Sequence, residues 1–268
     1  MTPEEQRAEL LWQSYFIPGT TVLANRLDLG EAEALRQAED AIATYRQHQI
    51  TTGVIEIPRT FDDVHLAAIH RALFSDVYTW AGQAQVVEMA KAGQNFAAVG
   101  HGIAGHLWDA KVATTRVGGA HTDRESFARG MGEVHASLNA AHPFREGNGR
   151  AAKVLLSQLA ERSPFVLDLK AVSAEEWNQA AAASMATMAT TGIPDPAPLT
   201  AVFRAMTVDR SPTPAGEPMH RDPALAWAME QAHRAAHTPI VPGLAPTDPA
   251  AGRRTIAAQR ERSGGYDR

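Results

Sequence analysis

The segment from His142 to Arg150 constrains the fold of this chain more than any other feature of the sequence. It reads His-Pro-Phe-Arg-Glu-Gly-Asn-Gly-Arg and lies between two stretches with helical periodicity. Pro143 stops the preceding helix, while Gly147 and Gly149 let the backbone turn and approach a ligand closely. We therefore predict a loop that enters a helix, within a mainly α-helical protein.

The residue types in this loop suit chemistry at a phosphate group. The backbone amides at the start of the second helix, with the positive end of its dipole, form an anion site. His142 is a base that works near neutral pH, and Glu146 is a carboxylate suited to magnesium. Arg150 and Lys153 add positive charge over the phosphates. The pattern indicates phosphoryl or nucleotidyl transfer; the alternative is a glycine-rich helix entry with a surface histidine.

Amphipathic helices are predicted through most of the chain, because apolar residues recur every three or four positions behind helix-capping residues. Ser173-Ala-Glu-Glu is a capping box, and proline is favoured in a first helical turn. The predicted helices cover Glu31 to Gln49, a segment capped by Asp62 or Asp63, a segment opening at Asp123, a segment from Ser173 to about Met188, and a segment from Pro198 to near Thr207.

Residues 83–96 break the helical pattern. Gln85 to Met89 is rich in residues that favour strands, and Lys91 to Gln94 supplies turn residues before Phe96. We predict a small β-hairpin inserted between helices.

Composition bounds the function and divides the chain. The net charge is -5 and the pI is near 6.1, which argues against direct nucleic-acid binding. Cysteine is absent, and neither a signal peptide nor a membrane span is evident, so we expect a cytoplasmic protein. Eight of the sixteen prolines lie in residues 208–268. We predict a tail there, partly disordered or a docking arm, with one helix at residues 223–236.

The loop resembles the signature of the Fic family: His, any residue, Phe, any residue, Asp or Glu, Gly, Asn, Gly, Arg, two residues of any kind, Arg. The match is complete through Arg150. Residues 15–27 and 73–82 are also similar to family segments, and the resemblance covers about residues 10–205. It implies the Fic fold over residues 1–207, a helical bundle with a β-hairpin flap beside the active-site loop.

The resemblance also implies a reaction, in which AMP moves from ATP to a Ser, Thr or Tyr hydroxyl of a target protein and pyrophosphate leaves. His142 is the implied base, Glu146 the implied Mg²⁺ ligand, and Phe144 a structural anchor of the loop. Arg145 occupies a variable family position, so we expect it to face solvent or to touch a phosphate.

The implied nucleotide-binding residues are Gly147, Asn148 and Gly149 at the anion hole and Arg150 at the outer phosphates. Lys153 stands where the family has the arginine that holds the γ-phosphate. Lysine keeps the charge and loses the bidentate fork, so a weaker grip on the γ-phosphate is expected.

The resemblance places the predicted hairpin at the family's flap, where a target segment docks by strand addition. Lys91 and Phe96 are the flap positions expected to take part. Of the two, Phe96 is expected to pack the flap down rather than to touch the nucleotide.

Many Fic proteins carry an inhibitory helix with the pattern Ser or Thr, three residues, Glu, then Gly or Asn. This sequence lacks that pattern. The resemblance then suggests a toxin restrained by a separate small antitoxin, with DNA gyrase or topoisomerase IV as first-choice targets.

Two other functions stay open at this stage. The same loop could transfer phosphate, UMP or phosphocholine, or Lys153 could have weakened catalysis and left a nucleotide-dependent binding module. Zinc is disfavoured, because His65 and His70, like His101 and His106, are five residues apart rather than four.

Overall fold

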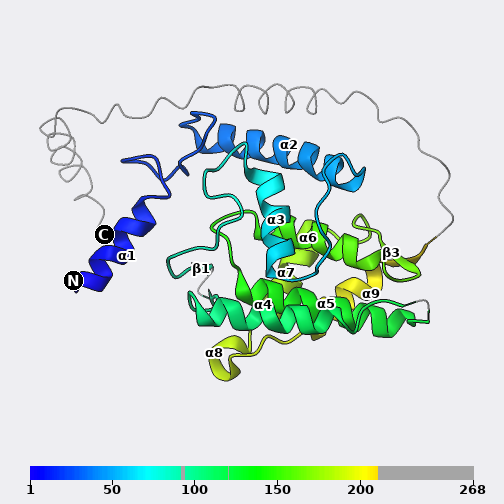
Figure 1. The fold of residues 1–268 in the computed structure, drawn as a ribbon. Coiled ribbons are helices and arrows are strands. Elements are labelled where there is room, and N and C mark those ends of the chain that lie inside the picture. The colour runs from blue at the N-terminus through cyan, green and yellow to red at the C-terminus, as the bar shows by residue number, and fades with distance from the viewer. Residues whose placement is uncertain (92–93, 120, 211–268) are drawn as a thin grey trace, which may run out of the picture. The chain divides into compact units, whose positions relative to one another are not determined.

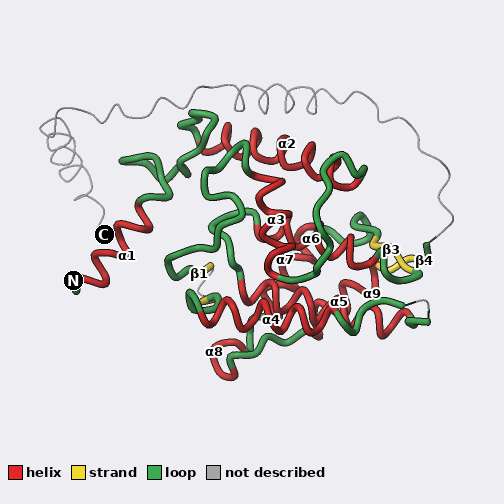
Figure 2. The backbone as a smooth tube through the Cα atoms, in the orientation of Figure 1, coloured by secondary structure: helices red, strands yellow, loops and turns green. Residues whose placement is uncertain are grey.

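The computed structural model describes residues 1–91, 94–119 and 121–210 (Figure 1). This part of the chain is mainly helical, as predicted, with two small antiparallel sheets (Figure 2). The helices are α1 (Pro3–Gln13), α2 (Ala32–Thr51), α3 (Asp63–Phe74), α4 (His101–Thr114), α5 (Arg124–Ala141), α6 (Asn148–Ala160), α7 (Ala174–Ser184), α8 (Met188–Thr191) and α9 (Ala197–Met206). The strands are β1 (Ala90–Lys91), β2 (Gln94–Asn95), β3 (Phe165–Leu167) and β4 (Thr207–Asp209).

Helix α5 carries the largest share of the core. Its apolar face, including Phe127, Met131 and Val134, is fully buried. Helices α4 and α9 pack along α5, and α6 and α7 also contact it (Figure 1). The two helices that flank the predicted loop are therefore anchored in one core.

A second packing layer brings α2 toward the start of α6. Helix α2 packs on α3, and α3 packs on α6. The apolar stripe of α2, with Leu35, Ala38 and Ile42 buried, faces this layer. Glu39 and Asp40, which lie between Ala38 and Ile42, thereby reach Arg150 at the start of α6.

Local capping signals set the helix starts, as the sequence predicted. Asp62 accepts a hydrogen bond from the His65 N–H (3.2 Å), and Asp123 accepts one from the Ser126 N–H (2.9 Å). Ser173 forms a complete capping box with Glu176. Helices α1, α4 and α8 were not predicted from the sequence.

The hairpin is smaller than predicted. Strands β1 and β2 pair antiparallel, with Ala90 opposite Asn95, but the predicted strand over Gln85–Met89 is wrong. Gln85 instead donates its backbone N–H to the Pro143 carbonyl (2.7 Å), which commits this segment to the loop. The sheet of β3 and β4 was not predicted, because its strands are far apart in sequence.

The tail lies outside the described residues, and so does the helix predicted at residues 223–236. The domain boundary at residue 207 stays a prediction. Among the helices that the structure describes, none is both long and apolar enough to cross a membrane.

The close approach of α5 and α9 gives a stability prediction. A Cβ at Gly132 would lie 2.5 Å from Thr200 Oγ1 and 2.8 Å from the Thr200 backbone nitrogen. Gly132→Ala should therefore cost about 1–3 kcal/mol of unfolding free energy, although alanine is the better helix former. Urea denaturation measures the change.

Gly105→Ala is the matched control, since Gly105 lies in α4 with nothing within 4 Å of the added methyl group. It should raise the unfolding free energy by about 0.5–1 kcal/mol. Equal responses of the two variants would contradict the packing described for α5 and α9.

Candidate active site

The active-site loop begins at His142, where α5 ends. His142 has a left-handed backbone (φ 40°, ψ 56°), which is uncommon for a residue with a side chain. Its N–H donates to the Leu138 carbonyl (3.1 Å), and its carbonyl accepts from Gln85 Nε2 (3.1 Å). Hydrogen bonds on both sides thus stabilise a strained backbone at the predicted base.

Asn148 closes the loop on itself. Its Oδ1 accepts from the Phe144 N–H (2.9 Å), and its Nδ2 donates to the Phe144 carbonyl (2.6 Å). The side-chain amide of Asn148 is therefore bonded to the loop backbone. The first backbone N–H groups of α6 are the donors that a helix N-terminus offers to an anion. A contact from the Asn148 side chain to a phosphate stays a prediction.

Gly147 is required by its surroundings. It adopts φ 82° as the N-cap of α6, and a Cβ there would lie 2.4 Å from Phe74 Cε2. No other residue fits this close approach without displacing the Phe74 ring. Gly149 has open space around it, which suits a ligand on that side.

Phe144 is buried and stacks on the His70 ring, with 3.8 Å between ring centroids and 25° between planes. His70 accepts a hydrogen bond from the Gly82 N–H at Nδ1 (2.8 Å) and donates from Nε2 to the Glu146 carbonyl (2.8 Å). Burial lowers the pKa of His70 to about 4, so the ring is neutral. His70 is therefore a positioning residue for the loop, a role that its sequence spacing to His65 did not predict.

Arg145 lies against an aromatic cluster instead of facing solvent. Its guanidinium carbon is 4.5 Å from the Trp12 ring centroid, 5.3 Å from that of Phe16 and 5.9 Å from that of Tyr15. Burial lowers the pKa of Arg145. This cation–π contact attaches the segment around α1 to the loop, and no local sequence signal predicted it.

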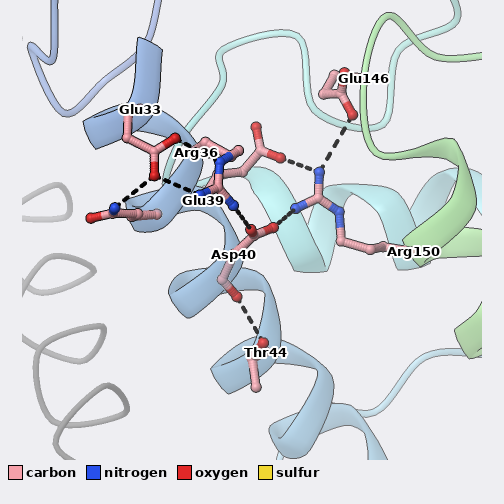
Figure 3. Close-up of polar contacts among 8 residues, drawn as sticks. Glu33, Arg36, Glu39, Asp40, Thr44, Glu146 and Arg150 are labelled. Carbon is pink, nitrogen blue, oxygen red and sulfur yellow. Dashed lines mark hydrogen bonds and ion pairs between the residues drawn. The ribbon is translucent and has the colours of Figure 1, made fainter. Parts of the chain in front are cut away.

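Arg150 is held by carboxylates from α2 and from the loop (Figure 3). It donates to Glu39, to Asp40 Oδ1 at 2.8 Å, and to Glu146 Oε1 at 3.4 Å. Glu39 is buried, and burial raises the pKa of its carboxyl against the opposing effect of Arg150. Tyr78 also donates its hydroxyl to Glu39. The two partners from α2, Glu39 and Asp40, were not predicted from the sequence.

Lys153 lies one helical turn after Arg150 on α6. Its Nζ is 4.9 Å from the Trp177 ring centroid, a cation–π contact with α7. Burial, and secondarily Arg150, lowers the pKa of Lys153. In this structure, the ammonium group of Lys153, which was predicted to bind phosphate, therefore lies over the Trp177 ring.

The flap lies beside the loop, as the resemblance implied. Lys91 is in β1, and its side chain lies outside what the structure describes. Phe96 follows β2 and stacks on the His142 ring, with 3.7 Å between centroids and 15° between planes. The expectation that Phe96 packs the flap down fits this contact; its role in target docking stays a prediction.

Two adjoining cavities open onto His142. A groove of about 480 Å³ runs over the loop, and its lining includes Glu146, Arg150 and Lys153. A second, mostly apolar cavity of about 310 Å³ lies between α5, α6 and α7. Both cavities share His142 and Trp177 in their linings, so one ligand can occupy both.

Within the described part of the chain, no group of three His, Asp or Glu side chains is arranged so that it could hold a metal ion. His70 already uses both ring nitrogens, and His106 lies 3.8 Å from Asp109 on its own helix. Neither contact supports a zinc site at these histidines.

The arrangement combines an imidazole, a helix N-terminus, two cations and one carboxylate around a groove. Such a site can bind a chain of phosphates at the α6 amides and can accept a proton from a hydroxyl near His142.

Residues 60–160 match the family model described as Fic/DOC family. The chain is 31% identical over 169 residues to a Salmonella typhimurium protein named probable protein adenylyltransferase Fic, covering 62% of this chain and 81% of that protein. It is 32% identical over 169 residues to protein adenylyltransferase VbhT of Bartonella schoenbuchensis, covering 62% of this chain but only 34% of VbhT.

A similar fold occurs in the BepC effector protein of Bartonella tribocorum, solved with bound AMPPNP. The TM-score is 0.64 at 22% sequence identity, over 74% of this chain and 98% of that one. At this identity the likeness concerns the fold.

The neutral, buried state of His70 gives a pH prediction. The pKa in the folded protein is about 4 against 6.5 ordinarily, so between these values the unfolded chain binds a proton that the fold excludes. The contribution of neutral His70 to the unfolding free energy is complete above pH 6.5 and is lost as the pH falls toward 4. Between pH 7 and 4.5, His70→Gln should lose about 2 kcal/mol less unfolding free energy than the wild type.

Urea denaturation at both pH values measures this difference. Glutamine can still donate to Glu146 and accept from Gly82, so the loop keeps its hydrogen bonds. His101→Gln, at the exposed start of α4, is the control and should leave the pH dependence unchanged. If His70→Gln showed the same pH dependence as the wild type, the neutral, buried state of His70 would be contradicted.

Proposed function

Because the chain belongs to the Fic/DOC family, we propose that it is a protein adenylyltransferase that moves AMP from ATP to a Ser, Thr or Tyr hydroxyl of another protein. The relatives from Salmonella typhimurium and Bartonella schoenbuchensis carry the adenylyltransferase activity in their names. The observation that carries the proposal is the groove in which His142 lies beside the N-terminus of α6 and two cations.

His142 is the general base in this proposal. The target hydroxyl gives its proton to the imidazole while its oxygen attacks the α-phosphorus in line. The bond from that phosphorus to the bridging oxygen of the β-phosphate breaks, and pyrophosphate leaves with the electron pair. His142 then passes the proton to the leaving group or to water. The target keeps a phosphodiester-linked AMP.

The phosphates bind at the α6 N-terminus, where backbone amides and the helix dipole stabilise negative charge. Gly147, Asn148 and Gly149 form this anion hole, with Gly149 leaving space for close approach. Arg150 and Lys153 supply charge over the outer phosphates.

Glu146 suits the Mg²⁺ that accompanies ATP. Its side chain is exposed in the groove, and Mg²⁺ needs only one or two carboxylates besides phosphate oxygens and water. When bound, the ion neutralises phosphate charge. The Gly147 N–H donates to Glu146 Oε1 (2.9 Å), which orients the carboxylate at the start of α6.

The adenine fits the apolar cavity between α5, α6 and α7. The volume of this cavity, about 310 Å³, is in the range of small-ligand pockets, and the cavity joins the phosphate groove at His142. Leu138, Ala152 and Trp177 supply apolar and aromatic walls for the base.

The acceptor protein docks on the flap as an added strand in this proposal. Strands β1 and β2 are only two residues each, so an extended target segment can extend their ladder. Lys91 and Phe96 are the flap residues proposed to face it. We propose DNA gyrase or topoisomerase IV as the first targets to test, in the cytoplasm, with a small antitoxin supplying the inhibitory helix that this sequence lacks.

A second candidate function rests on Lys153. A lysine on an aromatic platform grips the γ-phosphate at one point rather than by a fork, which favours a catalytically weakened, nucleotide-dependent binding module. Transfer of phosphate, UMP or phosphocholine by the same loop is the remaining alternative.

His142→Ala should lower AMP transfer by about 100-fold or more, because general-base catalysis contributes on this scale. The measurement is mass spectrometry of DNA gyrase B subunit after incubation with protein and Mg-ATP, alongside ATP labelled at the α- or γ-phosphate. An AMP adduct on gyrase that disappears in the variant supports base and target together. If gyrase carries no adduct and AMP appears on another protein of a cell lysate, AMP transfer stands and gyrase is discarded as the target. Label from the γ-phosphate on the target would contradict AMP transfer.

Lys153→Arg tests the binding-module alternative. If the wild type is a working transferase, the arginine fork should tighten the outer phosphates and lower KM for ATP by about tenfold or less, with similar kcat. Steady-state kinetics with α-labelled ATP measure both constants. Activity in the variant alone, with an inactive wild type, would favour the binding module instead.

A further inference from the structure

Phe96 of the flap stacks directly on the ring of the proposed base, His142. The Phe96 and His142 rings lie face to face, 3.7 Å between centroids and 15° from parallel. Both residues line the groove and the apolar cavity, so the stacked pair lies where the two meet. In the proposed reaction, the target hydroxyl has to reach His142 beside this stack.

Hydrogen bonds also hold both ends of the flap, one end to the loop and the other to the last turn of α5. On the entering side, Gln85 donates to the Pro143 and His142 carbonyls at 2.7 and 3.1 Å. On the leaving side, the Ala97 N–H donates to the Ala140 carbonyl of α5 (2.9 Å). These hydrogen bonds hold the two ends of the flap against the segment that carries His142.

Phe96 itself belongs to the flap ladder. Its backbone N–H donates to the Met89 carbonyl (3.1 Å), one step beyond the Ala90 and Asn95 pair. The position of its ring therefore depends on the pairing of β1 and β2. A target strand that pairs with this ladder would therefore contact the same backbone that positions the Phe96 ring.

We propose that Phe96 is a positioning residue that fixes the plane of the His142 imidazole and couples docking on the flap to alignment of the base. This rests on the proposed function. The His142 backbone lies in the left-handed region, and the direction of its ring is set by the two side-chain torsions. Stacking restricts them, and a misdirected base loses contact with the hydroxyl proton.

The test compares Phe96→Leu, which removes the ring, with Phe96→Tyr, which keeps it. Three properties are measured on the full chain: AMP transferred from α-labelled ATP to the protein itself and to water, the Kd for ATP by calorimetry, and the NMR resonances of the His142 ring. His142→Ala assigns those resonances. Val86→Ala is the control, because Val86 is an exposed flap-arm residue.

In Phe96→Leu we expect AMP transfer to fall about 10- to 100-fold, the scale of a misplaced catalytic group, with the Kd for ATP unchanged. The His142 ring protons should move downfield as the ring current is lost. Phe96→Tyr and Val86→Ala should keep the wild-type rate and resonances.

Wild-type transfer by Phe96→Leu would overturn the proposal, as would a weaker Kd for ATP with an unchanged rate constant, because Phe96 would then be a nucleotide contact. His142 resonances that do not differ between Phe96→Leu and the wild type would overturn it as well. If the wild type transfers no AMP, the proposed function fails, and the resonances alone decide whether the Phe96 ring fixes the imidazole.

Discussion

The stack of Phe144 on His70 is the contact on which the active-site loop depends. A loop between two helices has no ladder of its own, so its buried polar groups need partners from elsewhere. His70 bonds the Glu146 carbonyl, and Asn148 bonds both backbone groups of Phe144. With Phe144 seated in the core, the amides of α6 and the imidazole of His142 take fixed places relative to one another.

Charge balance around Arg150 constrains how the site binds phosphate. Removing the partner of a buried charge costs about 3–5 kcal/mol, and Glu39 is buried. Arg150 is therefore expected to keep Glu39 when nucleotide binds and to release Asp40 and Glu146, whose side chains are exposed. The α2 carboxylate then orients one side of the guanidinium while the other side faces phosphate.

The sequence predicted what depends on neighbours along the chain. Caps at Asp62, Asp123 and Ser173 and the periodic apolar faces determine helices locally, and these predictions are confirmed. The positioning contacts were not predictable in this way. His70 and Glu39 meet residues 76 and 111 positions away, and nothing in their local sequence distinguishes them from ordinary helix residues.

The consequence of lysine at position 153 follows from competing magnitudes. Leaving the Trp177 ring costs Lys153 about 0.5–2 kcal/mol of cation–π attraction, whereas a charge-assisted hydrogen bond contributes about 1.5–3 kcal/mol. The ammonium should therefore move to a phosphate when one is present. Any weakness of the grip then comes from the missing second N–H of a guanidinium fork, since the aromatic platform alone does not hold the lysine back.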